Sequence, residues 1–167
     1  MNLLINKLVR VFFIVSVILM QLNNQAFAVA HGTAIIQALR FGTVTPITGR
    51  CVMDHSTGAF TSDFNNTCPG IVGSPGQYKI VTDKNTLVKI TPFTFTYASN
   101  LFTFTPSGEV TNGVDTKVLT PNNATIIDSG STGVIDMEIG GTLNVTVPLT
   151  TSNSYIVDLE IDIVDTP

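Results

Sequence analysis

The last third of the chain alternates apolar and polar residues. Ile135, Met137 and Ile139 are separated by acidic residues, and the alternation resumes after Gly140-Gly141. A repeat of two residues is typical of a β-strand with one buried and one exposed face. We expect three strands here, with a break at the glycine pair, and we expect the last strand to be central to the sheet packing because its alternation is the longest. The apolar positions of that last strand are Tyr155, Val157, Leu159, Ile161 and Ile163.

Shorter alternating runs fill the preceding part of the chain. Thr33–Phe41 predicts an opening strand, and Phe93–Tyr97 with Leu101–Thr105 predicts a hairpin in which aromatic rings alternate with threonines. The polar stretch 54–76 predicts a long loop, and turn residues interrupt 106–132. No segment downstream of the first 28 residues repeats apolar residues every three or four positions, as an α-helix requires. About ten short strands separated by turns predict an all-β protein, an antiparallel Ig-like β-sandwich.

The first 28 residues follow a different pattern. Two basic residues precede an apolar core, Val11–Met20, and a polar stretch then leads to Ala26-Phe27-Ala28. This order is typical of a secretory signal peptide, and the apolar core is too short for a membrane anchor, which needs about 20 apolar residues. We expect cleavage after Ala28, with Ala30 as the second choice. The mature protein would then be a single β-sandwich domain, residues 29–167, with no membrane span.

Charge excludes one class of partner. The full chain has 8 Lys and Arg against 12 Asp and Glu, and two of the basic residues, Lys7 and Arg10, lie in the leader. The mature chain therefore has a net charge of −6. Nucleic-acid binding normally requires a basic stripe, so we expect no nucleic-acid partner.

The two cysteines, Cys51 and Cys68, lie in the exported part of the chain. An even pair in an oxidising compartment predicts a disulfide. This bond would close a loop of about 18 residues and stabilise the fold by roughly 3 kcal/mol. A metal site would need further ligands, and the mature chain has only His31 and His55. We therefore expect neither a metal site nor a cofactor.

Catalytic patterns are missing from the sequence. Asp54 and His55 are adjacent, but neighbours along a chain rarely point at one another, so we interpret them as part of a solvated loop. The chain contains no nucleophile elbow, zinc-protease motif or phosphate-binding glycine loop. We expect a protein that is not an enzyme.

Two further groups of side chains admit a functional and a structural interpretation. The acidic residues Asp158, Glu160, Asp162 and Asp165 could bind calcium, but calcium sites gather oxygens around a turn, so we interpret them as a solvated strand face.

The aromatic residues of the predicted hairpin could form a carbohydrate platform. Because they alternate with threonines, we interpret them as core. They are Phe93, Phe95, Tyr97, Phe102 and Phe104.

Several segments resemble a bacterial secreted-domain family that is known as domain of unknown function 4402. Leu39–Val44 is similar to its opening motif, Gly76–Ile80 to an inner strand, and Ile139–Val145 to its Val/Ile-Gly-Gly-Thr-Leu motif. Tyr155 stands where the family places a tyrosine, although Ser154 replaces the usual glycine before it. The cysteine pair is not a feature of the family.

This family is similar in turn to pilus and coat subunits of Gram-negative bacteria. The resemblance implies a non-catalytic, exported structural protein of the cell surface or periplasm, such as a pilin-like subunit, whose partners are other subunits or surface proteins held by β-strand pairing. The alternative is a monomeric extracellular module that binds a ligand or a carbohydrate. Thr33–Phe41 is the candidate for a donated strand, but it continues into the body of the protein without a linker. We therefore expect it to be the domain's own first strand.

Overall fold

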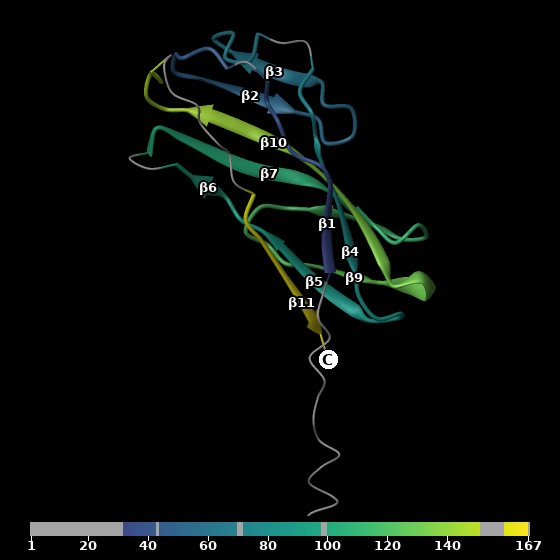
Figure 1. The fold of residues 1–167 in the computed structure, drawn as a ribbon. Helices are drawn as coiled ribbons and strands as arrows, with labels where there is room; N and C mark the ends of the chain where they lie inside the picture. The colour runs from purple at the N-terminus through teal and green to yellow at the C-terminus, as the bar shows by residue number, and fades with distance from the viewer. Residues whose placement is uncertain (1–31, 43, 70–71, 98–99, 151–158, 167) are drawn as a thin grey trace, which may run out of the picture.

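The computed structural model describes residues 32–42, 44–69, 72–97, 100–150 and 159–166. These residues form antiparallel β-sheets and contain no α-helix, as the sequence predicts (Figure 1). A 3₁₀ turn, Gly130–Thr132, precedes the longest strand. The strands are β1 (Gly32–Gln37), β2 (Gly49–Met53), β3 (Phe60–Phe64), β4 (Gly76–Val81), β5 (Leu87–Pro92), β6 (Phe95–Thr96), β7 (Phe102–Thr111), β8 (Thr116–Leu119), β9 (Thr125–Asp128), β10 (Val134–Val145) and β11 (Ile161–Thr166).

Strand β10 is central to the larger sheet. Along one edge, residues 134–139 pair with β4 and residues 141–145 pair with β2. Along its other edge, residues 136–145 pair with β7. Beyond these neighbours lie β1 next to β4, β3 next to β2, and β6 and β8 next to β7. The 12-residue strand β10 thus connects two halves of the sheet that do not pair with each other directly.

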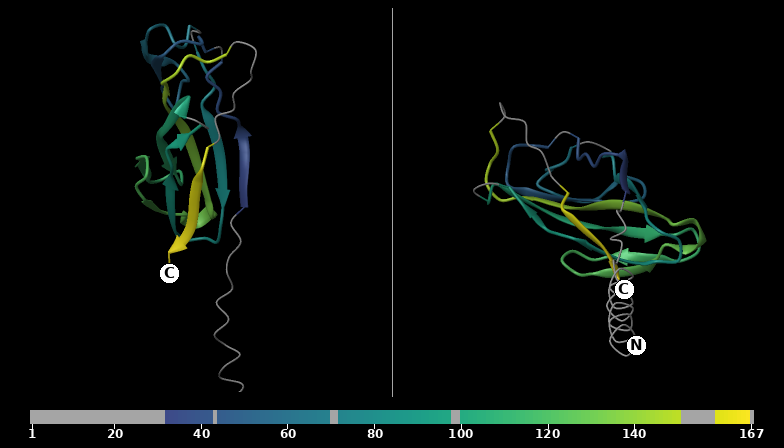
Figure 2. Two further views of the ribbon diagram at one scale, coloured as in Figure 1. Left: turned by 90° about the vertical axis from the view of Figure 1, so that its left-hand side faces the viewer. Right: turned by 60° about the horizontal axis from the view of Figure 1, so that its bottom comes forward.

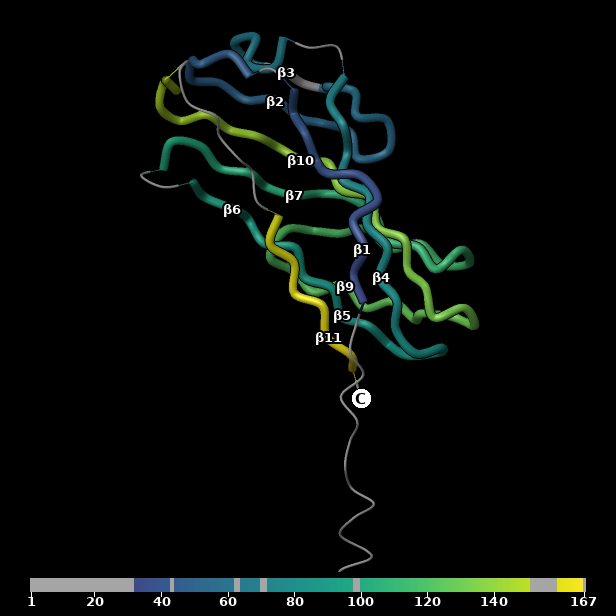
Figure 3. Tube along the Cα trace, viewed as in Figure 1, coloured from purple at the N-terminus to yellow at the C-terminus, as the bar shows by residue number. Residues whose placement is uncertain are grey.

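The predicted break at Gly140-Gly141 is wrong, because β10 runs through both glycines (Figure 3). A Cβ atom at Gly140 would lie 2.4 Å from the carbonyl oxygen of Met53, and one at Gly141 would lie 2.3 Å from that of Thr105. Glycine is therefore required by close backbone approach, which is its common role inside a strand. The buried positions stay odd-numbered on both sides of the pair, from Ile135 to Val145, so the alternation is that of one strand.

The facing strand β7 also runs through residues that the sequence predicts to be turn residues. Pro106 pairs with Gly141, Ser107 with Gly140, and Gly108 with Ile139. The strand-breaking residues of β7 and β10 therefore lie opposite one another, at the place where β10 changes partner from β4 to β2.

The predicted opening strand, Thr33–Phe41, divides into two parts with different surroundings. Among the described strands, β1 pairs only with β4 and lies at the edge of the sheet (Figure 2). All six of its residues are exposed. The chain then leaves the sheet edge, and Arg40 forms an isolated bridge with Ser74. Phe41 is buried, stacks on Phe60 and meets Phe104 edge-on. The second part of the segment therefore belongs to the core and the first part does not.

The core combines residues from both sheets. The smaller sheet, in the order β11-β5-β9, contributes Val88, Ile90 and Ile127. Of the predicted aromatic core, Phe102 and Phe104 are fully buried. Phe93, Phe95 and Tyr97 are half-buried, and the Tyr97 ring stacks on Phe102 with centroids 4.9 Å apart. The burial of this set supports the core interpretation over an exposed platform.

The final strand does not have the predicted central place. Strand β11 lies at the edge of the smaller sheet and pairs only with β5. Its faces agree with the alternation, because Ile161 and Ile163 are half-buried whereas Asp162 is exposed. Tyr155 and the residues up to 158 lie outside the described part of the chain.

The polar stretch 54–76 is more ordered than its composition predicts. It contains β3, which pairs with β2 in an antiparallel hairpin. Apolar Phe60 and Phe64 stand at the two ends of this strand, and the residues between them are polar. That composition explains why the sequence pattern shows a loop here.

Gly140→Ala should destabilise the fold by roughly 1–3 kcal/mol, because overpacking against backbone atoms forces the strands apart. The matched control is Gly32→Ala, whose Cβ would meet its nearest atom at an ordinary 3.9 Å. Urea denaturation followed by circular dichroism measures both variants. Equal urea midpoints for Gly140→Ala and the unsubstituted protein would contradict the requirement for glycine at position 140.

Candidate functional site

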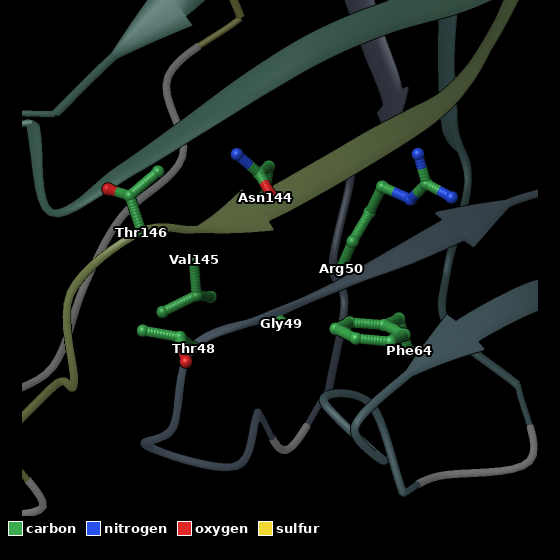
Figure 4. Close-up of a pocket in the computed structure, with 7 residues that line it drawn as sticks. All are labelled: Thr48, Gly49, Arg50, Phe64, Asn144, Val145 and Thr146. Carbon is green, nitrogen blue, oxygen red and sulfur yellow. The ribbon is translucent and has the colours of Figure 1, made fainter.

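A groove lies over the end of the large sheet at which β2, β3 and β10 meet (Figure 4). It has a volume of about 520 Å³ and is shallow and widely open to solvent. Three different strands contribute the exposed side chains of Arg50 and Phe64 and the half-buried side chain of Asn144. The remaining lining residues are Thr48, Gly49, Val145 and Thr146.

Strand register places these three side chains in one row. Phe64 is the Cα partner of Arg50, and Arg50 is the partner of Asn144. Asn144 is in turn the partner of Thr103 on β7. Directly paired residues project from the same face of a sheet with Cβ atoms about 4.5–5.5 Å apart. The row therefore presents an aromatic ring, a cation, an amide and a hydroxyl in that order.

The polar groups of this row are available for a ligand. Arg50 and Asn144 make no side-chain hydrogen bond or ion pair within the described part of the protein. Phe64 is 62% exposed although its side chain is large and apolar. Among the described residues that line the groove, Arg50 is the one that carries a charge.

The strand ends beneath the groove are held by a dense set of contacts. The Thr45 amide donates to the Thr67 carbonyl at 2.7 Å, and the Asn65 side chain donates to the Thr48 carbonyl at 2.9 Å. The Thr67 hydroxyl donates to the Phe64 carbonyl at 2.6 Å. Gly49 allows this packing, because a Cβ there would lie 2.0 Å from the Thr67 hydroxyl oxygen.

The predicted disulfide joins Cys51 to Cys68 beneath the same site. Both cysteines are buried, and Cys51 directly follows Arg50 on β2. The covalent bond therefore ties β2 to the segment after β3. Disulfides of this kind persist in oxidising, extracytoplasmic compartments.

Asp54 and His55 do not face each other as a dyad. The carboxylate of Asp54 accepts hydrogen bonds from the hydroxyl and amide groups of Thr57 and Ser56. These bonds, the Thr57 hydroxyl first, hold the pKa of Asp54 well below its usual range. The imidazole Nε2 of His55 lies 3.8 Å from a carboxylate oxygen of Glu109 instead. Asp54 is therefore a turn-capping residue of the β2–β3 hairpin.

The acidic residues near the C-terminus lie apart from other metal ligands. Glu160 and Asp162 are exposed, Asp165 is half-buried within reach of the Thr82 hydroxyl, and Asp158 lies outside the described residues, as does His31. In the described ranges, no three His, Cys, Asp or Glu side chains come close enough together to hold a metal ion. Within the same ranges, no helix is long and apolar enough to cross a membrane.

A second, smaller hollow of about 270 Å³ lies beside β1. Ile36 stands at its margin, and Lys79 and Asp136 form an ion pair of 3.0 Å within it. Glu138 of β10 also lines this hollow, so the surface beside the exposed Ile36 carries one ion pair and one further carboxylate.

Sequence reasoning left the binding residues undefined and missed the groove. Phe64 lies in the stretch predicted as loop, and Arg50 and Asn144 belong to no motif that sets them apart from the other polar residues of the chain. To find this site from the sequence, one would need to know the register in which β2 pairs with β3 and with β10. The pairing of β2 with β10 depends on contacts between segments far apart in the chain.

Comparisons with known proteins give no relative: no family model, curated protein or solved structure matches this chain. The resemblance to the secreted-domain family therefore stays a prediction.

Replacing both Cys51 and Cys68 by alanine should lower the free energy of unfolding by roughly 3 kcal/mol, because the unfolded chain gains the entropy of an open loop of about 18 residues. Urea denaturation measures the loss, and intact mass of the unsubstituted protein should show two hydrogens fewer than the reduced chain. Reductant should lower the stability of the unsubstituted protein and leave the double variant unchanged. Two titratable thiols in protein unfolded without reductant would contradict the bond.

Proposed function

We propose that this chain is an exported, non-catalytic structural protein of the cell surface or periplasm, and that its copies associate by pairing of the edge strand β1. The two antiparallel sheets around a shared core support an Ig-like β-sandwich as the architecture of the subunit. The disulfide and the signal-peptide pattern of the first 28 residues support export.

The observation that carries this proposal is the chemistry of β1. Its free edge offers unpaired backbone donors and acceptors, and its side chains include Ile35 and Ile36, which are 68% and 61% exposed. Natural proteins usually protect such an edge with charged side chains, proline or a covering segment. Strand β1 has no charged residue and no proline.

The other edge strands of the described sheets differ from β1 in this respect. Strand β8 contains Lys117, β9 contains Asp128, β11 contains Asp162 and Asp165, and β3 contains Asp63. Strand β6 has no charge but is two residues long. Among the described edges, β1 is therefore the one long enough and uncharged enough to accept another strand.

The occupant that fits this edge is the β1 strand of a second copy. Antiparallel pairing of β1 with itself is self-complementary, so the same patch serves both subunits around a two-fold axis. The mature chains carry a net charge of −6 and repel one another in general. The edge strand β1 itself carries no charge, which limits this repulsion at the contact.

Strand β1 is seated on its own β4, which supports a self-complete subunit over one that must receive a donated strand. Assembly would then proceed by addition at the free edge of β1. The alternative function, a monomeric module that binds a ligand or carbohydrate, requires that β1 stay unpaired in solution. The oligomeric state separates these two functions.

The variant Ile35→Lys/Ile36→Lys should weaken self-association by about tenfold or more, because it places a charge on each face of the edge strand. Sedimentation velocity of residues 29–167, over about a hundredfold range of protein concentration, measures the self-association of the unsubstituted protein and of the variant. Val118→Lys is the control, since Val118 is 66% exposed on the edge strand β8, which already carries a charge. A monomer at every concentration, or equal weakening by the control, would favour the monomeric alternative.

Export should remove residues 1–28, so that the protein recovered from the periplasm or medium begins at Val29, with Ala30 as the second cleavage site. Intact-mass measurement identifies the N-terminus. Replacing the apolar core residues Leu19 and Met20 by arginine should retain the chain in the cytoplasm, because a signal peptide needs an uninterrupted apolar core. Recovery of exported protein that still begins at Met1 would refute the leader assignment.

A further inference from the structure

We propose that the groove over β2, β3 and β10 binds an acidic saccharide, with Arg50 holding the carboxylate, Phe64 covering the apolar face of a sugar ring, and Asn144 bonding to ring hydroxyls. This inference does not depend on assembly through β1. The groove lies on the outward face at one end of the large sheet, whereas β1 is an edge strand paired to β4 (Figures 1 and 4).

Arg50 selects for an anion. Its guanidinium has no ionic partner in the described structure and is the single charge among the groove residues. A guanidinium presents a planar fork of N–H groups that matches a carboxylate with two parallel hydrogen bonds. In a protein of net negative charge, such a site attracts an acidic ligand to one defined position.

Phe64 selects for a ligand with a flat apolar surface. The ring stands directly beside Arg50 in the cross-strand row, and it is exposed rather than packed in the core. An exposed aromatic ring supplies a large contact area at low conformational cost. The C–H groups on one face of a pyranose ring provide such an apolar surface, with hydroxyl groups around its rim.

The polar residues of the row suit hydroxyl groups. Asn144 offers both a donor and an acceptor, Thr103 follows it on β7, and Thr48 contributes a hydroxyl at the groove margin. Three strand spacings separate Phe64 from Thr103, about 14 Å in a sheet. That length accommodates more than one sugar ring, so an oligosaccharide fits better than a single sugar acid.

A peptide fits this site less well. Extended peptides bind by adding a strand to a sheet edge, where backbone groups are free. Strand β2 is paired on both sides, with β3 and with β10, so its backbone has little left to offer across the groove. Recognition across the face of β2 must therefore come from side chains, and those present are a cation, an amide, hydroxyls and one aromatic ring.

The site is also rigid before any ligand arrives. The disulfide and the hydrogen bonds of Thr45, Asn65 and Thr67 hold the strand ends beneath Arg50 and Phe64. A preorganised site loses less entropy when it binds, which increases affinity for a given set of contacts.

Titration of the disulfide-bonded protein with tetragalacturonate, followed by isothermal calorimetry or amide chemical shifts, tests the proposal. We expect saturable binding with shifts centred on β2, β3 and the end of β10. Arg50→Gln should weaken it by about tenfold or more and Arg50→Lys by less, because lysine keeps the charge and loses the fork. Phe64→Ala should weaken it by about fivefold, and Phe64→Tyr should restore it.

Arg40→Gln is the matched control, since the Arg40 side chain is also exposed and has no ion pair in the described structure but lies outside the groove. It should leave the affinity unchanged, whereas equal losses for Arg40→Gln and Arg50→Gln would indicate nonspecific attraction and overturn the site. Cellotetraose should bind at least about tenfold more weakly, because it lacks the carboxylate. Absence of tetragalacturonate binding, equal binding of the neutral sugar, or full competition by millimolar inorganic phosphate would each overturn an acidic-saccharide site. Unchanged thermal midpoints show that the variants are folded.

Discussion

The large sheet depends on the close approach of β7, β10 and the β2–β3 hairpin at Gly140 and Gly141. At this point β10 leaves β4 and begins to pair with β2, while β7 stays beside it throughout. Backbone atoms of Met53, His55 and Thr105 occupy the space that side chains would need. The absence of side chains at both positions lets one 12-residue strand serve two groups of neighbours.

The exposed edge strand β1 and the groove over β2 and β3 lie on opposite sides of this change of partner. Before it, β10 supports β4 and through it the exposed edge strand β1. After it, β10 supports β2 and β3, whose outward side chains form the groove. The change therefore separates the exposed edge strand β1 from the groove over β2, β3 and β10.

The two parts of the sheet are stabilised in different ways. The smaller sheet lies toward the end of the molecule away from β2 and β3, so apolar residues from two sheets meet there (Figure 1). The β2–β3 end combines Phe41, Phe60 and the buried disulfide with turn hydrogen bonds. The β2–β3 end buries less apolar surface than the end where the two sheets meet, and the stabilisation from burial scales with the buried area. The disulfide adds stability at the end where burial contributes less.

The amino-acid pattern by itself determined that the protein is antiparallel β, which faces of the strands are buried, and that Cys51 pairs with Cys68. These properties are local or nearly so. Side-chain direction alternates along a strand whatever lies beside it, and each of the two cysteines has only the other as a possible partner within the chain. Tertiary structure alone decided that Gly140-Gly141 and Pro106 lie within strands, that β11 is an edge, that β1 carries no core residue, and that Arg50, Phe64 and Asn144 stand in one row. Each of these depends on which strand is the neighbour and in what register, and register is set by packing between segments distant in the chain.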